Sequence, residues 1–121
     1  MRCLIVDDSS AFGDAARRIL AGSGVDVVAA AATGAEALRY TRTLRPDIVL
    51  VDVDLGDENG FDVAEDIHRQ ISPCPAVIMI STHDQEDFAD LTAASPALGF
   101  LPKMSLSAAA IRRFITELPG T

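Results

Sequence analysis

The sequence is poor in the features that mark disulfide-rich, secreted and nucleic-acid-binding proteins. Cysteine occurs only at positions 3 and 74, and two cysteines this far apart, without a CxxC spacing, make a disulfide framework unexpected. Basic residues are scarce: 10 lysines and arginines face 18 acids, which leaves a formal net charge of −8. Contacts to nucleic-acid phosphates require clustered basic side chains, so the composition argues against direct binding of DNA or RNA.

Long apolar runs are missing as well. No stretch approaches the roughly 20 apolar residues that a membrane-spanning helix needs. The apolar run at the N-terminus meets Asp7 and Asp8 too early for a signal peptide. We therefore expect no membrane association and a reducing, cytoplasmic location. The 121 residues are 49% hydrophobic, which is enough for one globular domain with its own core.

Short apolar runs alternate along the chain with segments of helical periodicity. The apolar runs are bounded by Asp, Gly, Pro or Ser and cover residues 3–6, 25–31, 48–51, 76–80 and 97–101. Runs this short, apolar on both faces, are typical of strands buried in a parallel sheet. An apolar stripe at helical spacing follows each run, and the last stripe predicts a helix over residues 105–118.

Helix-start signals support this alternation. Thr33 with Glu36, and Thr82 with Gln85, have the spacing of capping boxes. Five strands alternating with five helices predict right-handed crossovers and an α/β fold, a doubly wound (βα)5 three-layer sandwich around a parallel five-stranded sheet. In such a sheet the functional crevice lies beyond the carboxyl ends of the strands.

Acidic residues stand at two of these predicted strand ends. Asp7 and Asp8 follow the first strand, and Asp52 follows the third. Unit charges about 4 Å apart repel by about 4 kcal/mol at an effective dielectric of about 20, so a pocket with three carboxylates needs a cation or must protonate one of them. Hard carboxylate oxygens with a phosphate nearby favour Mg²⁺.

Ser81 and Lys103 follow the fourth and fifth strands. Lys103 is the only lysine in the chain, and a lone ammonium beside three acids suits a mobile charge for a phosphate or a carboxylate. Ser81 adds a hydroxyl donor. Together these groups indicate phosphoryl transfer onto a carboxylate, although each of them alone has an ordinary explanation as a helix cap or a solvated surface residue.

Four motifs, in this order, resemble the receiver domain of bacterial two-component response regulators over nearly the whole chain. They are Leu4-Ile5-Val6-Asp7-Asp8, Pro46-Asp47-Ile48-Val49-Leu50-Val51-Asp52 with Gly60, Ile78-Met79-Ile80-Ser81 and Gly99-Phe100-Leu101-Pro102-Lys103. The resemblance implies a flavodoxin-like fold with strand order 2-1-3-4-5. It also implies that residues 1–121 form one receiver domain and that the effector domain is absent from this chain.

The resemblance implies a phosphoacceptor and a metal site. Asp52 would accept the phosphoryl group from a sensor histidine kinase or from a small acyl phosphate. Mg²⁺ would be held by Asp7, Asp8, Asp52 and the backbone carbonyl of Asp54. Because such a domain catalyses its own phosphorylation and dephosphorylation, whether it counts as an enzyme is a matter of definition.

The resemblance also implies residues that bind the phosphate and respond to it. Ser81 and Lys103 would each contact a phosphoryl oxygen. Phe100 would be an aromatic switch that turns inward as Ser81 moves toward the phosphate. Thr82 stands where the family usually has Ala or Gly, and we expect Thr82 and His83 to border the pocket.

Residues 99–103 and 105–110 resemble receivers that precede a LuxR-type DNA-binding domain. The sequence has no helix-turn-helix pattern and no basic patch, so we expect DNA to be bound only through an effector domain. The output, transcription, would pass through the face built by the fourth helix, the fifth strand and the fifth helix. The same face would form a homodimer.

Two other interpretations are open at this point. Asp52-Val53-Asp54 resembles the DxD motif of haloacid-dehalogenase-type phosphatases, which also use Mg²⁺ and an aspartyl phosphate. In that family the DxD strand precedes the other motifs, and Gly56 replaces the usual Thr or Val. A receiver that serves only as a protein-binding scaffold is the other interpretation, and it is disfavoured because every chemical position is filled. Turnover of a phosphate ester with Mg²⁺ would distinguish the phosphatase.

Overall fold

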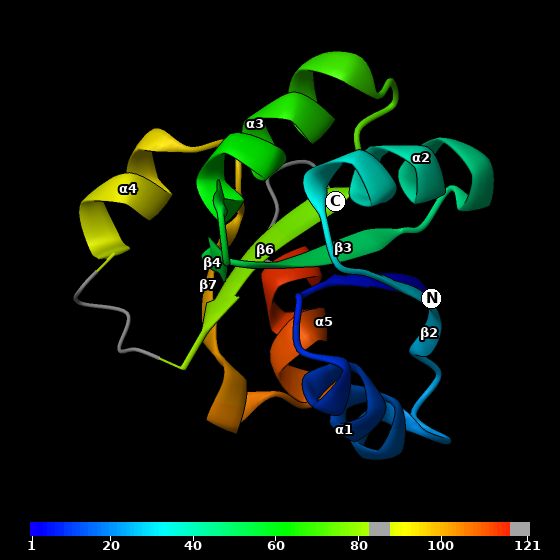
Figure 1. Ribbon diagram of the computed structural model, residues 1–121. Coiled ribbons are helices and arrows are strands. Elements are labelled where there is room, and N and C mark those ends of the chain that lie inside the picture. The colour runs from blue at the N-terminus through cyan, green and yellow to red at the C-terminus, as the bar shows by residue number, and fades with distance from the viewer. Residues whose placement is uncertain (83–87, 117–121) are drawn as a thin grey trace.

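The structure, a computed structural model, describes residues 1–82 and 88–116 and is built around a five-stranded sheet (Figure 1). Its strands are β1 (Arg2–Val6), β2 (Asp26–Ala31), β3 (Ile48–Asp52), β6 (Ala76–Ser81) and β7 (Gly99–Pro102). All neighbouring strands pair in parallel, in the order β2-β1-β3-β6-β7. Counted among the strands of this sheet, that is the predicted order 2-1-3-4-5, so the predicted fold class is confirmed.

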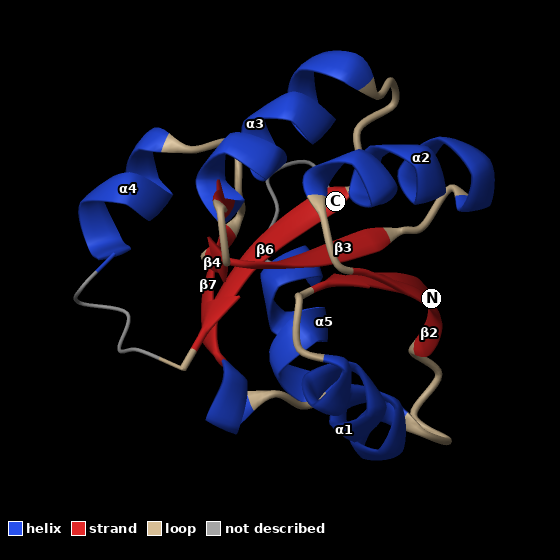
Figure 2. Cartoon of the chain, in the orientation of Figure 1, coloured by secondary structure: helices blue, strands red, loops and turns tan. Residues whose placement is uncertain are grey.

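Helices cover both faces of the sheet, which gives three layers (Figure 2). One face carries α1 (Ser10–Leu20) and α5 (Ala108–Thr116). The other carries α2 (Gly34–Leu44) and α3 (Gly60–Gln70), with α4 (Ala89–Ala94) beside α3 at the β7 edge (Figure 1). Among the described residues, none of these helices combines the length and the apolar character that crossing a bilayer requires.

Alternating side chains of the central strands divide the core into two apolar layers. In β3, Val49 and Val51 pack in the layer of α2 and α3, whereas Ile48 and Leu50 pack in the layer of α1 and α5. β1 and β6 alternate in the same way. All five residues of β3 are buried, which explains why the sequence shows continuous apolar runs at these strands.

The first half of the predicted capping box at the start of α2 is confirmed, and the second half is shifted by one residue. The Thr33 hydroxyl oxygen accepts a hydrogen bond from the backbone N–H of Glu36 at 3.2 Å. The Glu36 carboxylate accepts one from the backbone N–H of Ala32 at 3.0 Å, one residue before the cap. The second predicted box pairs Thr82 with Gln85, which lies outside the described residues.

The last helix begins later than predicted. Lys103–Ser105 forms a short 3₁₀ helix, and α5 starts at Ala108 instead of residue 105. The reason is the cap: the Ser107 hydroxyl oxygen accepts a hydrogen bond from the backbone N–H of Ala110 at 3.0 Å. The predicted end of this helix, at residue 118, lies outside the described residues.

One strand prediction is corrected, and two short strands were not predicted. The strand predicted over residues 97–101 is observed as β7 over Gly99–Pro102, because the Ser95 hydroxyl oxygen holds the Ala97 N–H in a turn at 3.2 Å. The sequence also did not predict a small antiparallel hairpin of β4 (Asp54–Leu55) and β5 (Glu58–Asn59). Two-residue strands are too short to produce a periodic pattern.

Candidate functional site

The carboxyl ends of four strands and the segments that follow them enclose an acidic cavity of about 200 Å³. It brings together all five side chains predicted to act jointly, from four separate segments of the chain. Its lining consists of Asp7, Asp8, Ser9, Asp52, Asp54, Gly56, Ser81, Thr82 and Lys103. Thr82 is part of this lining, whereas His83, the other residue expected at the border, lies outside the described residues.

The Lys103 ammonium bridges two of the carboxylates. Its nitrogen Nζ lies 2.6 Å from Asp7 Oδ2 and 3.0 Å from Asp52 Oδ2. The lysine side chain is 12% exposed and the two carboxylates less, so these ion pairs are screened far less than pairs at the surface. Burial alone would lower the pKa of Lys103, but its hydrogen bonds to Asp7 and Asp52 outweigh that effect and raise the pKa above its ordinary value. Lys103 is therefore charged at neutral pH.

Both oxygens of the Asp52 carboxylate accept hydrogen bonds. Oδ2 accepts a hydrogen bond from Lys103, and Oδ1 accepts one from the backbone N–H of Asp54 at 3.2 Å. Burial raises the pKa of Asp52 above its ordinary value; these two hydrogen bonds oppose the rise, and the charge of Asp7 adds to it. The Asp52 carboxylate is thus held in one orientation, but its burial disfavours the charged form. A further positive charge in the cavity would stabilise that form.

The turn from β1 to α1 fixes Asp7. Its backbone N–H donates to Ala31 O at 2.9 Å, and its Oδ1 accepts from the backbone N–H of Ser9 at 2.8 Å. Ser9 is the N-cap of α1, since its hydroxyl oxygen accepts from the backbone N–H of Phe12 at 3.4 Å. Asp7 and Asp8 do not cap this helix, so their carboxylates are free to line the cavity.

The acidic cluster suits a hard divalent cation. One carboxylate oxygen from each of Asp7, Asp8 and Asp52 lies within 4.8 Å of the other two. An all-oxygen set of this kind is the ligand chemistry of Mg²⁺, and the mutual repulsion of the three charges favours its binding. Gly56 leaves room beside this cluster, because a Cβ there would lie 3.3 Å from Asp8 Oδ2.

Asp54 is the first residue of β4, just before the turn that joins β4 to β5. Its side chain is exposed, and Oδ1 accepts a hydrogen bond from the backbone N–H of Gly56 at 3.1 Å. The carboxylate therefore shapes the turn. Asp54 lines the cavity, and the ligand role of its backbone carbonyl stays a prediction.

Phe100 lies in the apolar layer of α2 and α3 and is 3% exposed. Its ring stacks on Phe88 with centroids 5.8 Å apart, and Phe88 meets Phe61 of α3 at 6.3 Å. Three aromatic rings thus connect β7, the residue before α4, and the start of α3. The role of Phe100 as a switch stays a prediction.

Phe12 belongs to the site although the sequence did not predict it. The Lys103 nitrogen lies over its ring, 4.6 Å from the centroid. A local signal existed, because Phe12 comes one helical turn after the Ser9 cap, beside the predicted crevice. Its partner Lys103 is at the other end of the chain, and that pairing appears only in the fold.

Gly60 joins the start of α3 to the end of β3. Its backbone N–H donates to Val53 O at 2.8 Å. A Cβ at this position would lie 1.9 Å from Asp52 O. The close approach requires glycine, and it ties α3 to the residue that carries the buried carboxylate.

Gly60→Ala is expected to lower the free energy of unfolding by about 3 kcal/mol, because the Asp52 carbonyl cannot move without displacing the end of β3. Gly13→Ala is the matched control. Gly13 also lies in a helix, but its Cβ would meet only Ala30 at 3.5 Å, an ordinary contact, so this variant should gain up to about 1 kcal/mol. Urea denaturation measures both. Equal stabilities of the two variants would refute the steric explanation.

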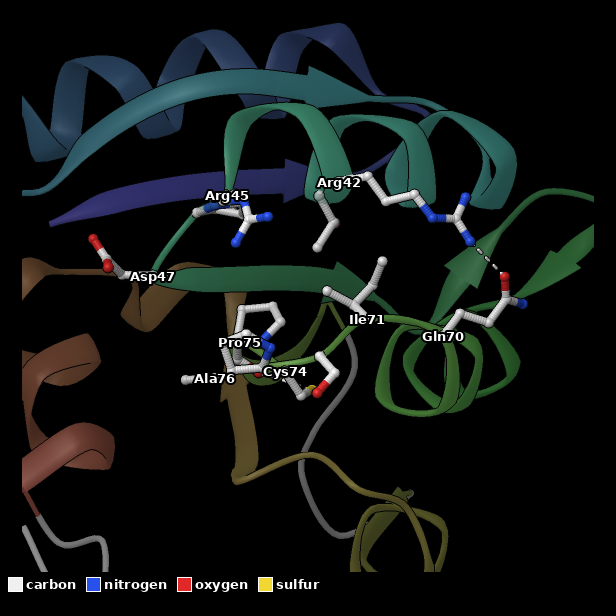
Figure 3. Close-up of a pocket in the computed structure, with 12 residues that line it drawn as sticks. Arg42, Arg45, Asp47, Gln70, Ile71, Cys74, Pro75 and Ala76 are labelled. Carbon is white, nitrogen blue, oxygen red and sulfur yellow. Dashed lines mark hydrogen bonds between the residues drawn. The ribbon is translucent and has the colours of Figure 1, made fainter.

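A larger cavity, of about 450 Å³, lies at the opposite end of β3 and β6 (Figure 3). Its described lining contains one acidic residue, Asp47, whose carboxylate accepts from the backbone N–H of Arg2 at 2.7 Å. Across it, Arg42 donates to the Gln70 side-chain oxygen at 2.7 Å (Figure 3). Without a group of acids, this cavity does not offer the chemistry of the smaller one.

A doubly wound α/β sandwich with three aspartates and a lysine at its strand ends has the architecture of a signalling receiver. The family model of the response regulator receiver domain matches residues 3–115 of this chain. The chain therefore belongs to the response regulator receiver domains. This membership does not favour the haloacid-dehalogenase alternative.

Curated relatives agree with this assignment. The DNA-binding transcriptional activator EvgA of Escherichia coli (strain K12) is 32% identical over 104 residues, 85% of this chain and 50% of that protein. A protein-glutamate methylesterase/protein-glutamine glutaminase of Haloarcula marismortui is 39% identical over 92 residues, 76% of this chain and 24% of that protein. The chain thus spans about a quarter to half the length of these relatives.

Solved structures place the chain near the receivers of LuxR-type regulators, as its sequence predicted. A LuxR-family two-component response regulator from Aurantimonas sp. SI85-9A1 gives a TM-score of 0.81 at 29% identity, over 95% of this chain and 82% of that one. The signal receiver domain of the putative response regulator NarL from Mycobacterium tuberculosis gives 0.79 at 28% identity, over 94% and 95%.

Proposed function

We propose that this receiver domain is a phosphorylation-dependent switch that accepts a phosphoryl group on Asp52. The observation that supports this most is the Lys103 ammonium 3.0 Å from the Asp52 carboxylate, in a cavity that holds two further acids. A nucleophile, a set of metal ligands and a phosphate-binding cation then share one small space. The donor is a phosphohistidine of a sensor histidine kinase or a small acyl phosphate.

The side chains divide the transfer between them. A carboxylate oxygen of Asp52 attacks phosphorus, the bond from phosphorus to the donor breaks, and the donor leaves with the electron pair. The Lys103 ammonium exchanges part of its contact with Asp7 and Asp52 for a contact with one phosphoryl oxygen. Ser81, buried at the end of β6, donates its hydroxyl to another.

Mg²⁺ fits the donor set of Asp7, Asp8 and Asp52, with the backbone carbonyl of Asp54 as a further ligand. When bound, the ion neutralises charge on the transferring group. The chain itself supplies one ammonium against three carboxylates, an excess of negative charge that would repel an incoming phosphate.

Mg²⁺ is expected to raise the unfolding temperature, because only the folded chain presents the acidic cluster. At a Mg²⁺ concentration about a hundredfold above its Kd, the free energy of unfolding should rise by about 2.7 kcal/mol. Asp8→Asn should lose most of it, whereas Asp14→Asn, which changes an exposed acid of α1 outside the cavity, should keep it. Calorimetry with Mg²⁺ and with a chelator measures the effect. Equal stabilisation of Asp8→Asn and wild type would rule out the site.

The output surface is proposed to be the face of α4, β7 and α5. Phe100 of β7 stacks on Phe88, directly before α4, so a movement of the Phe100 ring would shift α4. Homodimerisation through this face follows as a proposal. The relative EvgA is a DNA-binding transcriptional activator, which supports transcription as the output, with DNA bound by a separate effector domain.

Phosphorylation by a small donor tests the function. After incubation with acetyl phosphate and Mg²⁺, intact-mass spectrometry should find one added phosphoryl group that hydroxylamine removes, since hydroxylamine cleaves acyl phosphates. A stable, hydroxylamine-resistant adduct would point to another residue type. Rapid hydrolysis of a phosphate ester such as p-nitrophenyl phosphate would instead support the phosphatase interpretation.

A further inference from the structure

The Lys103 ammonium has a third partner besides its two carboxylates. Its nitrogen lies 4.6 Å from the centroid of the Phe12 ring, over the ring face. A cation in this position is attracted by the negative face of the ring, and more strongly when water is excluded. Because the Lys103 side chain is only 12% exposed, this contact forms in a largely desolvated space.

One short segment supplies two of the three partners. Asp7 accepts from the backbone of Ser9, and the Ser9 hydroxyl oxygen accepts from the backbone N–H of Phe12. Phe12 also packs against the apolar layer of α1 and α5. The ring is therefore held in a fixed place relative to Asp7. Lys103 contacts both ends of this segment, because its ammonium lies over the Phe12 ring and also pairs with the Asp7 carboxylate.

We propose that Phe12 is a positioning residue for phosphoryl transfer, whose ring keeps the Lys103 ammonium desolvated and directed at Asp52. The inference rests on the function proposed above. Holding a long lysine side chain in one geometry costs conformational entropy, and the ring restricts it before the donor arrives. The attraction extends to about 6 Å from the centroid, so the ammonium can turn toward a phosphoryl oxygen without losing it.

The contact can be measured directly, because Lys103 is the only lysine in the chain. After labelling with carbon-13 lysine, NMR should show one set of side-chain signals, with the Hε protons shifted upfield by the ring current of Phe12. Phe12→Leu should remove the shift. Phe114→Leu, at another partly buried phenylalanine of the same apolar layer, should keep it. An unshifted wild-type signal overturns the proposal.

The rate of phosphorylation by acetyl phosphate then tests the role. Phe12→Leu should slow the reaction on the order of tenfold, whereas Phe12→Tyr, which keeps the ring face, should stay within about twofold of wild type. In a Lys103→Met background, Phe12→Leu should have no further effect. Equal slowing in both backgrounds would mean a structural role only and overturns the proposal. If Phe12→Leu melts far below Phe114→Leu, Phe12→Met takes its place in the same comparison.

The two proposals fail in different ways. A wild-type protein that takes up no phosphoryl group overturns the function at Asp52, and the role of Phe12 with it. A wild-type protein that is phosphorylated, while Phe12→Leu reacts at the same rate, overturns the role of Phe12 alone.

Discussion

Asp52→Asn is expected to take up no hydroxylamine-labile phosphoryl group from acetyl phosphate under conditions that fully label the wild type. The substitution keeps the shape of the side chain but removes the nucleophilic carboxylate. Asp57→Asn is the matched control, since Asp57 is an exposed acid in the turn between β4 and β5. It should label like the wild type, and intact mass measures both.

The fold should survive this substitution. Burial raises the pKa of Asp52 in the folded protein, and a carboxyl with a raised pKa makes folding less favourable once the pH exceeds its unfolded value. At neutral pH the charge is therefore a cost, and asparagine removes it. Without Mg²⁺, the melting temperature of Asp52→Asn should equal or exceed that of the wild type. A labelled Asp52→Asn protein would show that a different residue accepts the phosphoryl group.

Lys103→Met is expected to slow phosphorylation on the order of 100-fold, because it removes a charged donor directed at the transferring group. It also leaves Asp7 and Asp52 without their shared cation, at a cost of about 3–5 kcal/mol. Mg²⁺ should restore part of this stability. Rates are therefore compared with Mg²⁺ present, after circular dichroism has verified the fold.

Arg69→Met is the control for losing a basic side chain. Arg69 pairs with Asp66 at 2.6 Å, but the two side chains are 64% and 38% exposed, and surface pairs of this kind contribute at most about 1 kcal/mol. Its phosphorylation rate should match the wild type. A Lys103→Met rate within about threefold of the control would exclude the lysine from the transfer step.

The sequence was sufficient to predict the fold class and the five side chains that meet at the acidic cavity, which are Asp7, Asp8, Asp52, Ser81 and Lys103. Parallel strands place their carboxyl ends at one edge of the sheet, so residues that follow separate apolar runs had to converge. For this reason Asp7, Asp52 and Lys103 could be assigned to one site although they are far apart in the chain. The apolar runs were unambiguous because the central strands are buried on both faces.

What the sequence could not predict depends on single hydrogen bonds and on pairs distant in the chain. Ser107 sets the start of α5, and Ser9, rather than the aspartate pair, caps α1. Neither choice changes the apolar periodicity. The contact of Phe12 with Lys103 requires the turn after β1 and the turn after β7 to be placed side by side, which no local pattern contains.

Chemical trapping of the modified residue tests the central claim most directly. Borohydride reduces an aspartyl phosphate to homoserine, and peptide mass spectrometry then locates the change in the chain. In wild-type protein treated with acetyl phosphate and Mg²⁺, we expect homoserine at position 52 and at no other acid of the cavity. Homoserine at position 7, 8 or 54, or phosphorylated protein that yields none, would contradict the account.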